Sequence, residues 1–297
     1  MSLILQYDRT GTNIAHFGLS AALLTPFHAD FSLNLPLFCS HAKTMLESGA
    51  NGVTLFGTTG EGASIGFDER ARTIAAMIDS GVSPDVMTIG LCASAVADTL
   101  AQVQQAVSFG ITDFLLLPPF YFKDPGDAAL FDWHKSVFDA APPQARFILY
   151  HIPQVTQVPL SPKLVARLFE AFPDRIIALK DSAGQWDFTR TLLESRTIPV
   201  LVGDERLLHK AAALGGAGSI CGMANIYPRR MQTLFETQAE DAALSADVDF
   251  IVAHPVIPAL KTALMAQSGD PGWTTMRPPL RALSGADREA FQARFGT

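Results

Sequence analysis

Short runs of apolar residues recur along the chain, and longer stretches with a different periodicity separate them. A continuous apolar run is typical of a parallel strand that is buried on both faces. We expect eight such strands, at Leu19–Leu24, Gly52–Leu55, Val86–Leu91, Asp113–Leu117, Phe147–Tyr150, Ile176–Lys180, Pro199–Val202 and Gly218–Cys221.

The stretches between these runs have helical periodicity. Val96, Leu100, Val103 and Val107, for example, recur at spacings of three and four residues, which predicts a helix with one apolar face. Strands that alternate with helices predict a parallel sheet. Eight such units favour a closed (β/α)8 barrel, the TIM barrel, over a doubly wound sheet, because no extended glycine-rich nucleotide-binding sequence follows the first strand.

The chain continues beyond the eighth predicted strand. The segment from Ala224 to Thr297 includes a helical stretch at Ala239–Ala253, and no Ser/Gly-rich linker divides the chain. We therefore expect a (β/α)8 catalytic barrel in residues 1–223 and C-terminal helices in residues 224–297 that pack on the barrel, together forming a single structural domain.

Composition and charge exclude several classes of protein. The 297 residues are 48% hydrophobic and 17% charged, with a net charge of −7, which argues against a general nucleic-acid or anionic-membrane role. No apolar run is long enough for a membrane span, and the N-terminus lacks the pattern of a signal peptide. The three cysteines, Cys39, Cys92 and Cys221, form no metal-binding pattern. We expect a cytoplasmic protein.

Lys180 is the first candidate for chemistry. It ends the apolar run Ile176–Leu179 and would lie at the carboxyl end of a strand, where the active sites of α/β barrels are built. A poorly solvated ammonium there loses its proton more readily, and the neutral amine can attack a carbonyl. A lysine on the surface just past a strand is the alternative.

Other predicted strand ends also have polar or aromatic residues. The second strand leads into Gly57-Thr58-Thr59-Gly60-Glu61, whose backbone N–H groups could bind a carboxylate, although an ordinary loop with a Thr or Glu cap is the alternative. Tyr150 ends the fifth strand and could exchange protons with a carbinolamine, or serve as a core tyrosine. Pro118–Phe122 follows the fourth strand as packing or a binding wall, and Glu205 follows the seventh.

This combination of motifs resembles the dihydrodipicolinate synthase / N-acetylneuraminate lyase family of Schiff-base aldolases and lyases. The resemblance covers nearly the whole chain, from about Leu19 to Lys261. The motifs that carry it are Gly57-Thr58-Thr59-Gly60-Glu61, Tyr150-His151-Ile152-Pro153, Leu179-Lys180-Asp181-Ser182 and Leu214-Gly215-Gly216-Ala217-Gly218-Ser219-Ile220.

The resemblance implies a role for each site residue. Lys180 would form a Schiff base with pyruvate or another 2-oxo acid, whose carboxylate the Thr58-Thr59 backbone would hold. Tyr150 would move protons and would be linked through the Thr59 hydroxyl to Tyr121 of a neighbouring subunit. The Ile220 carbonyl would contact the bound ketoacid. The resemblance further implies a homotetramer or homodimer that uses no metal or organic cofactor, with an aldehyde as the second substrate.

Three positions depart from the family pattern. Val155 stands where the synthases have an arginine that binds the carboxylate of aspartate semialdehyde, and valine offers neither charge nor a donor. Gln157 replaces a glycine. His151 replaces an asparagine; we expect a structural role for His151, and contact with the pocket is the alternative. Glu205 only partly matches the polyol-binding pattern of the sialate lyases. We therefore predict a different second substrate, such as a sugar-derived 2-keto-3-deoxy acid or a hydrophobic aldehyde, unless Lys123 or Arg206 replaces the arginine.

Three functions are consistent with these residues. The first is a carbon–carbon or carbon–oxygen lyase that acts through a lysine Schiff base, with true 4-hydroxy-tetrahydrodipicolinate synthase as its more specific form. The second is a phosphate-binding barrel isomerase in which Lys180 acts only by its charge. The third is a non-catalytic protein that binds 2-oxo acids. The presence of Lys180, Tyr150 and Thr59 together favours the lyase.

Overall fold

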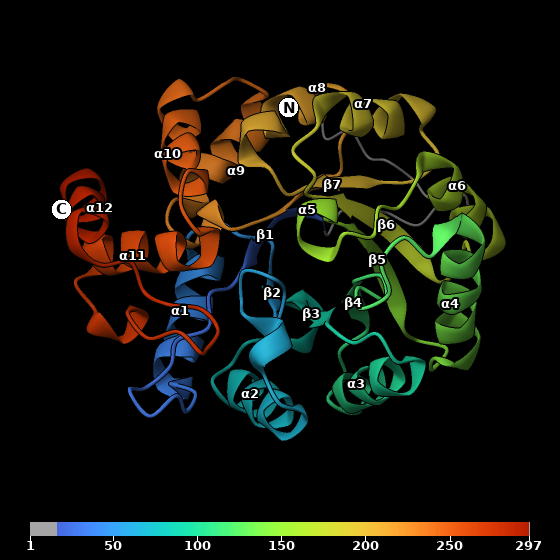
Figure 1. Ribbon diagram of the computed structural model, residues 1–297, viewed down its shortest axis with the longest axis horizontal. Helices are drawn as coiled ribbons and strands as arrows, with labels where there is room; N and C mark the ends of the chain where they lie inside the picture. The colour runs from blue at the N-terminus through green and yellow to red at the C-terminus, as the bar shows by residue number, and fades with distance from the viewer. Residues whose placement is uncertain (1–16, 297) are drawn as a thin grey trace.

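A computed structural model describes residues 17–296 of the chain (Figure 1). In this part of the protein, eight parallel strands close into a barrel in sequence order. They are β1 (Gly18–Ala22), β2 (Gly52–Leu55), β3 (Met87–Leu91), β4 (Asp113–Leu116), β5 (Arg146–His151), β6 (Ile176–Asp181), β7 (Val200–Val202) and β8 (Gly218–Cys221). The (β/α)8 fold and all eight predicted strands are thereby confirmed. The predictions for residues 1–16, including the absence of a signal peptide, lie outside the described residues.

Helices surround the barrel and continue beyond its last strand (Figure 1). Those that follow β1 to β7 are α1 (Leu35–Glu47), α2 (Phe67–Asp79), α3 (Val96–Ser108), α4 (Gly126–Ala140), the short α5 (Pro153–Thr156), α6 (Pro162–Ala171), α7 (Trp186–Ser195) and α8 (Leu208–Ala213). Those that follow β8 are α9 (Pro228–Thr237), α10 (Ala242–Val252), α11 (Val256–Ser268) and α12 (Gly285–Phe295).

The helix after β8 belongs to the layer around the barrel. Helix α9 contacts both α8 and β1, so it covers the seam at which β8 pairs with β1. Helices α10 and α11 contact each other, as do α11 and α12, and the three form a group at one side of the barrel (Figure 1). The helical stretch predicted at Ala239–Ala253 is confirmed as α10, while the domain boundary at residue 223 stays a prediction.

Alternation along each strand divides the core into two layers. Side chains of successive residues point to opposite faces of a strand, so one set fills the barrel and the other packs beneath the helices. In β6, Ala178 lies in the inner cluster with Ile148 and Tyr150, whereas Leu179 belongs to the larger cluster beneath the helices. Lys180 follows the same alternation and points into the barrel, toward Tyr150.

Candidate active site

The amine of Lys180 and the hydroxyl of Tyr150 meet inside the barrel. The two residues are register partners on the adjacent strands β6 and β5, which places their side chains next to each other on the inner face. The Nζ of Lys180 donates a hydrogen bond to the Tyr150 hydroxyl at 3.2 Å and lies 4.2 Å from the centre of its ring. Only 4% of Lys180 and 3% of Tyr150 are exposed, so both groups are held away from bulk solvent.

Gly203, directly after β7, leaves room for the lysine side chain. A Cβ at this position would lie 1.9 Å from Oγ of Ser182 and 3.2 Å from Cε of Lys180. The first distance is far too short for non-bonded atoms, so any side chain would displace the residues around the amine. The absence of a side chain at residue 203 therefore helps to set the position of Lys180. The sequence analysis did not identify this residue.

Tyr150 is also joined to the loop after β2. Its hydroxyl donates to Oγ1 of Thr58 at 3.4 Å. We expected the Thr59 hydroxyl in this place, so the partner of Tyr150 is corrected by one residue, to Thr58. Within residues 17–296, neither the Thr58 nor the Thr59 amide has a hydrogen-bond acceptor. Two neighbouring N–H groups without acceptors are suited to an anion such as a carboxylate.

Contacts of Phe56 with Arg70 and Gly90 support the turn that leads into this loop. Phe56 has a left-handed backbone with φ of 58°, which is uncommon for a bulky residue and persists only where its surroundings enforce it. The buried guanidinium of Arg70 lies 4.7 Å from the Phe56 ring and donates to the carbonyls of Gly90 and Gly62 at 2.8 and 2.9 Å. A Cβ on Gly90 would lie 2.4 Å from the Phe56 carbonyl. These contacts fix the conformation in which the chain enters the threonine loop.

Glu205 follows β7 and Ile220 lies on β8, the two strands that come after β6 around the barrel. The buried Glu205 side chain accepts a hydrogen bond from the Met223 amide at 2.8 Å. Burial raises the pKa of the Glu205 carboxyl, and the Met223 amide and the Lys180 charge oppose this rise. Ile220 on β8 is buried in the inner cluster that also contains Tyr150. Glu205 is thus a carboxyl whose ionisation is disfavoured, close enough to Lys180 to feel its charge.

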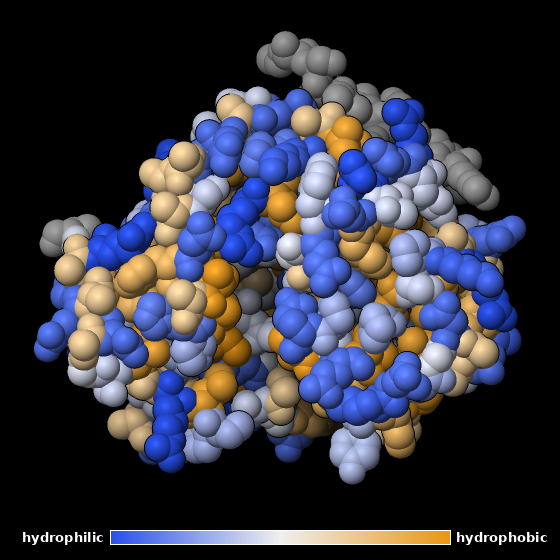
Figure 2. Space-filling view, turned by 45° about the horizontal axis from the view of Figure 1, so that its top comes forward, coloured by the Kyte–Doolittle hydropathy of each residue, from blue (hydrophilic) through white to orange (hydrophobic). Residues whose placement is uncertain are grey.

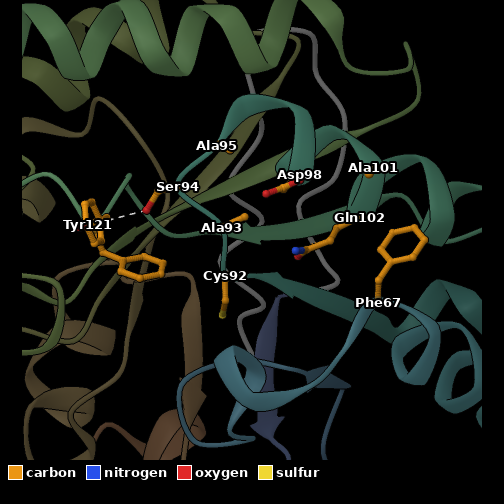
Figure 3. A pocket seen from close by; sticks show the side chains of 10 residues that line it. Phe67, Cys92, Ala93, Ser94, Ala95, Asp98, Ala101, Gln102 and Tyr121 are labelled. Atoms are coloured by element: carbon orange, nitrogen blue, oxygen red, sulfur yellow. Dashed lines mark hydrogen bonds between the residues drawn. The ribbon is translucent and has the colours of Figure 1, made fainter.

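Tyr121 and Val155 are the most exposed of the predicted site residues. Tyr121 is 76% exposed, and its amide donates to Oγ of Ser94 at 3.2 Å (Figure 3). In the part of the chain that the structure describes, no hydrogen bond joins Tyr121 to Thr58 or Tyr150. Val155 lies on α5 and is 54% exposed. The chain therefore brings together Lys180, Tyr150 and Thr58, and leaves Tyr121 outside this group.

The two basic residues that could replace the missing arginine differ in their partners. Arg206 donates to Asp204 through two nitrogens and also pairs with Asp249 at 2.7 Å, so its charge is already neutralised. Lys123 donates instead to two carbonyl oxygens, that of Phe120 at 2.6 Å and that of Thr156 at 3.1 Å. Of these two cations, only Lys123 is without a carboxylate partner among the described residues.

His151 and Asp181 point away from the barrel interior. The His151 ring stacks on Phe188 with the ring centres 4.2 Å apart, and its Nδ1 accepts a hydrogen bond from the Leu160 amide. Burial lowers the pKa of His151 to about 4, so the ring is neutral at pH 7. Asp181 accepts from the Thr189 hydroxyl at 2.6 Å and from the Ala183 amide. The geometry of His151 supports the structural role that we expected for it.

A cavity of about 590 Å³ lies against α3, and Phe67, Cys92, Ser94, Gln102 and Tyr121 are among its lining residues (Figure 3). Neither Lys180 nor Tyr150 lines it.

In residues 17–296, no three His, Cys, Asp or Glu side chains gather in a way that could hold a metal ion. None of the helices described there is both long and apolar enough to cross a bilayer. Figure 2 shows hydrophilic side chains over much of one face, with hydrophobic patches around a central hollow.

Comparison with known proteins identifies the family. A model of the dihydrodipicolinate synthetase family matches residues 15–295. An uncharacterized DapA-like lyase of Chloroflexus aurantiacus is 33% identical, over 94% of this chain and 95% of the relative. A 4-hydroxy-tetrahydrodipicolinate synthase of Nostoc sp. is 26% identical, over 91% of this chain and 93% of its own length.

A solved structure agrees with these sequence matches. Dihydrodipicolinate synthase from Agrobacterium tumefaciens has a TM-score of 0.91 and 38% identity, covering 94% of this chain and 98% of that one. The family model spans all eight strands of the barrel and the helices that follow them. The chain therefore belongs to the dihydrodipicolinate synthetase family.

Proposed function

We propose that this protein is a lyase that acts through a Schiff base between Lys180 and pyruvate or another 2-oxo acid. The observation that carries the proposal is the buried pair of the Lys180 amine and the Tyr150 hydroxyl, 3.2 Å apart. An amine that is largely shielded from water and lies beside a proton donor is suited to attack on a ketone.

The groups around Lys180 allow each step of imine formation to balance. The Nζ lone pair attacks C2 of the 2-oxo acid, and a proton of the resulting positively charged nitrogen moves to the ketone oxygen, which becomes a carbinolamine hydroxyl. Tyr150 supplies a second proton as this hydroxyl leaves as water, and Thr58 accepts a hydrogen bond from the Tyr150 hydroxyl. The iminium then draws electrons from C3, the Tyr150 phenolate takes up the C3 proton, and an enamine forms.

The enamine accounts for chemistry in both directions. Its C3 attacks the carbon of an aldehyde, the aldehyde oxygen takes up a proton, and hydrolysis of the iminium returns free Lys180. In reverse, the bond between C3 and C4 breaks and the iminium accepts its electrons. One water leaves when the imine forms and one is consumed when it hydrolyses. Lys180 and Tyr150 supply the nucleophile and the proton, so the proposed cycle requires neither a metal nor an organic cofactor.

The threonine loop is the proposed site for the carboxylate of the 2-oxo acid. The amides of Thr58 and Thr59 have no acceptor among the described residues, so a carboxylate would satisfy both without displacing a bond that already exists. The Ile220 carbonyl, on β8, is the proposed second contact of the bound ketoacid. Thr59 thus contributes through its backbone, and the hydroxyl next to Tyr150 is that of Thr58.

The second substrate is proposed to be an aldehyde without an anionic group at the end that meets α5. Val155 offers no charge there, and Arg206 is already paired with Asp204 and Asp249. The Lys123 ammonium already donates to the carbonyls of Phe120 and Thr156. Glu205, a buried carboxyl, is suited to a hydroxyl-bearing tail as in a sugar-derived 2-keto-3-deoxy acid. True 4-hydroxy-tetrahydrodipicolinate synthase, the activity named for the Nostoc relative, is the alternative.

We also propose that a second copy of the chain completes the site. Tyr121 and its neighbour Phe122 are both strongly exposed, with ring centres 5.5 Å apart, and Phe67 adds a third exposed aromatic ring. Exposed aromatic groups of this kind are typical of subunit interfaces. A homodimer or homotetramer would bury them and could bring the partner's tyrosine to Thr58. A cytoplasmic location fits this proposal.

Exchange of the pyruvate methyl protons tests the proposed function without knowledge of the aldehyde. The enzyme and pyruvate are mixed in D₂O, and the methyl signal is followed by proton NMR. We expect the signal to decay at a rate proportional to the enzyme concentration, because enamine formation removes a proton from C3. Binding of pyruvate without exchange would identify a non-catalytic 2-oxo acid binding protein and would contradict the proposal.

A further inference from the structure

A buried ion pair joins the threonine loop to the C-terminal helices. Glu61 is the last residue of Gly57-Thr58-Thr59-Gly60-Glu61, and Lys261 lies 200 residues later on α11. Both side chains are 0% exposed, and Nζ of Lys261 donates to Oε1 of Glu61. The same ammonium donates to the Thr275 carbonyl at 2.9 Å, and Oε2 of Glu61 accepts from the Arg277 amide at 3.1 Å. The carboxylate therefore has partners on both of its oxygens.

Arg277 extends this connection to the residues that follow the loop. Its guanidinium pairs with both carboxylate oxygens of Glu69 on α2, at 2.7 and 2.5 Å, and donates to the Ser64 carbonyl at 2.7 Å. The Lys261 and Arg277 cations lie 4.6 and 4.7 Å from the centre of the buried Phe27 ring. Two cations and two carboxylates thus hold the segment from Glu61 to Glu69 against the C-terminal part of the chain.

The backbone at Glu61 shows why the loop needs such support. Its φ is 55°, in the left-handed region that a residue with a side chain rarely adopts. The Glu61 amide donates back to the Thr58 carbonyl at 3.1 Å, and the Gly62 amide to that of Gly57 at 3.0 Å. The conformation of Glu61 therefore determines the turn that presents the Thr58 and Thr59 amides. Strain of this kind persists only where surrounding contacts enforce it.

We infer that Glu61 and Lys261 are positioning residues, through which the C-terminal helices set the geometry of the anion-binding amides of Thr58 and Thr59. The identity of the anion as the carboxylate of a 2-oxo acid rests on the proposed function. Both side chains are fully buried and already have hydrogen-bond partners within the protein, so they act on that carboxylate through the loop. A buried ion pair is a weak source of stability compared with well-packed apolar residues, so a geometric role explains it better than a purely stabilising one.

The variant that tests this inference is Glu61→Gln combined with Lys261→Met. It removes both charges together, whereas either change alone would leave a buried charge without its partner. Phe291→Leu is the matched control: Phe291 is buried in α12, where its ring packs against those of Phe250, His254 and Phe295. Glu61→Asp is a second route to the same question, since it keeps the charge and shortens the side chain by one methylene.

Two measurements are made on each folded variant. Hydrogen–deuterium exchange of the peptide that contains residues 57–62 is measured on the protein without ligand. We expect it to be about tenfold faster in the double variant and unchanged in Phe291→Leu. The pyruvate concentration that gives half-maximal borohydride trapping should rise about tenfold, while the maximal trapping stays within about twofold, because Lys180 itself is untouched.

The outcomes separate this inference from the proposed function. If the unmodified protein is not trapped by pyruvate, the proposed function fails, and the exchange measurement still decides whether Glu61 and Lys261 hold the loop. Suppose instead that the unmodified protein is trapped by pyruvate. The positioning role is then wrong if, in a folded double variant or in Glu61→Asp, both the exchange rate of residues 57–62 and the half-saturating pyruvate concentration stay within about twofold of the unmodified protein. Equal effects in Phe291→Leu would reduce the pair to an ordinary structural contact and would also overturn the inference.

Discussion

The Lys180 amine and the Tyr150 hydroxyl lie 3.2 Å apart on neighbouring strands, with both side chains inside the barrel. The Tyr150 hydroxyl in turn lies 3.4 Å from that of Thr58. These three groups form a continuous polar path from the amine to the loop whose amides have no acceptor among the described residues. This path links the amine to the loop that is proposed to bind the carboxylate of the 2-oxo acid.

Tyr150→Phe tests the proton transfer. The variant keeps the ring that packs in the inner cluster and removes only the hydroxyl, so the fold should be retained. Loss of a general acid–base should slow exchange of the pyruvate methyl protons by ~10²–10⁴-fold. Proton NMR in D₂O measures this rate. A decrease of less than about threefold would show that another group moves the proton.

Gly203→Ala tests whether the space beside the lysine matters. The new Cβ would lie 1.9 Å from Oγ of Ser182 and 3.2 Å from Cε of Lys180, so Lys180 should be displaced. We expect imine formation, followed by borohydride trapping over time, to slow by about tenfold or more. Adding Ser182→Ala removes the closest of these atoms and should restore part of the rate. An unchanged rate in Gly203→Ala alone would contradict this explanation.

Val155→Arg tests the basis of substrate choice. A charge-assisted hydrogen bond contributes ~1.5–3 kcal/mol, equivalent to roughly 10–150-fold in kcat/KM. The unmodified protein should therefore condense pyruvate with aspartate semialdehyde poorly compared with neutral aldehydes, and Val155→Arg should improve that reaction. Val155→Leu is the control for side-chain size and should not improve it. The prediction is wrong if aspartate semialdehyde has the highest kcat/KM of all aldehydes tested with the unmodified protein.

His134 should make the protein less stable in mild acid. Burial lowers its pKa to about 4 in the folded state from the ordinary value of 6.5, so the unfolded chain binds a proton that the folded protein does not. The contribution of the neutral His134 ring to the free energy of unfolding is fully present above the unfolded pKa of 6.5. It is lost as the pH falls from there toward the folded pKa of about 4.

Urea unfolding at pH 7.5 and pH 5 measures this effect. Replacement of His134 by a residue that does not titrate, as in His134→Phe, should reduce the difference in the free energy of unfolding between the two pH values by about 2 kcal/mol. An identical difference in the variant and the unmodified protein would show that His134 does not contribute.

The strands and the central pair of residues could be predicted from the sequence for a clear physical reason. A parallel strand buried on both faces is a continuous apolar run, and the run that ends at Lys180 also fixes the height of the amine in the barrel. The start of Tyr150-His151-Ile152-Pro153 has the same position on β5. Because β5 and β6 are adjacent in the barrel, Tyr150 and Lys180 at their ends lie next to each other.

The errors and omissions have an equally physical origin. Which of two adjacent threonines faces Tyr150 depends on the left-handed turn at Phe56, and no periodicity reveals such a turn. The space that Gly203 leaves becomes visible only when Ser182 and Lys180 are placed beside it. The Glu61–Lys261 pair joins residues that are 200 positions apart, and a lone lysine in an apolar helix gives no indication of its partner.

Reductive trapping shows most directly whether Lys180 is the Schiff-base lysine. The protein is incubated with pyruvate and borohydride, digested, and examined by mass spectrometry. Lys180→Arg is the test variant, because guanidinium stays protonated and cannot form the imine. Lys210→Arg makes the same change on α8, at a lysine that does not contact the Tyr150 hydroxyl. We predict one reduced pyruvate unit on the peptide that contains Lys180, its loss in Lys180→Arg and its retention in Lys210→Arg. An adduct that persists in Lys180→Arg, or none in the unmodified protein, would contradict the assignment of Lys180 as the Schiff-base lysine.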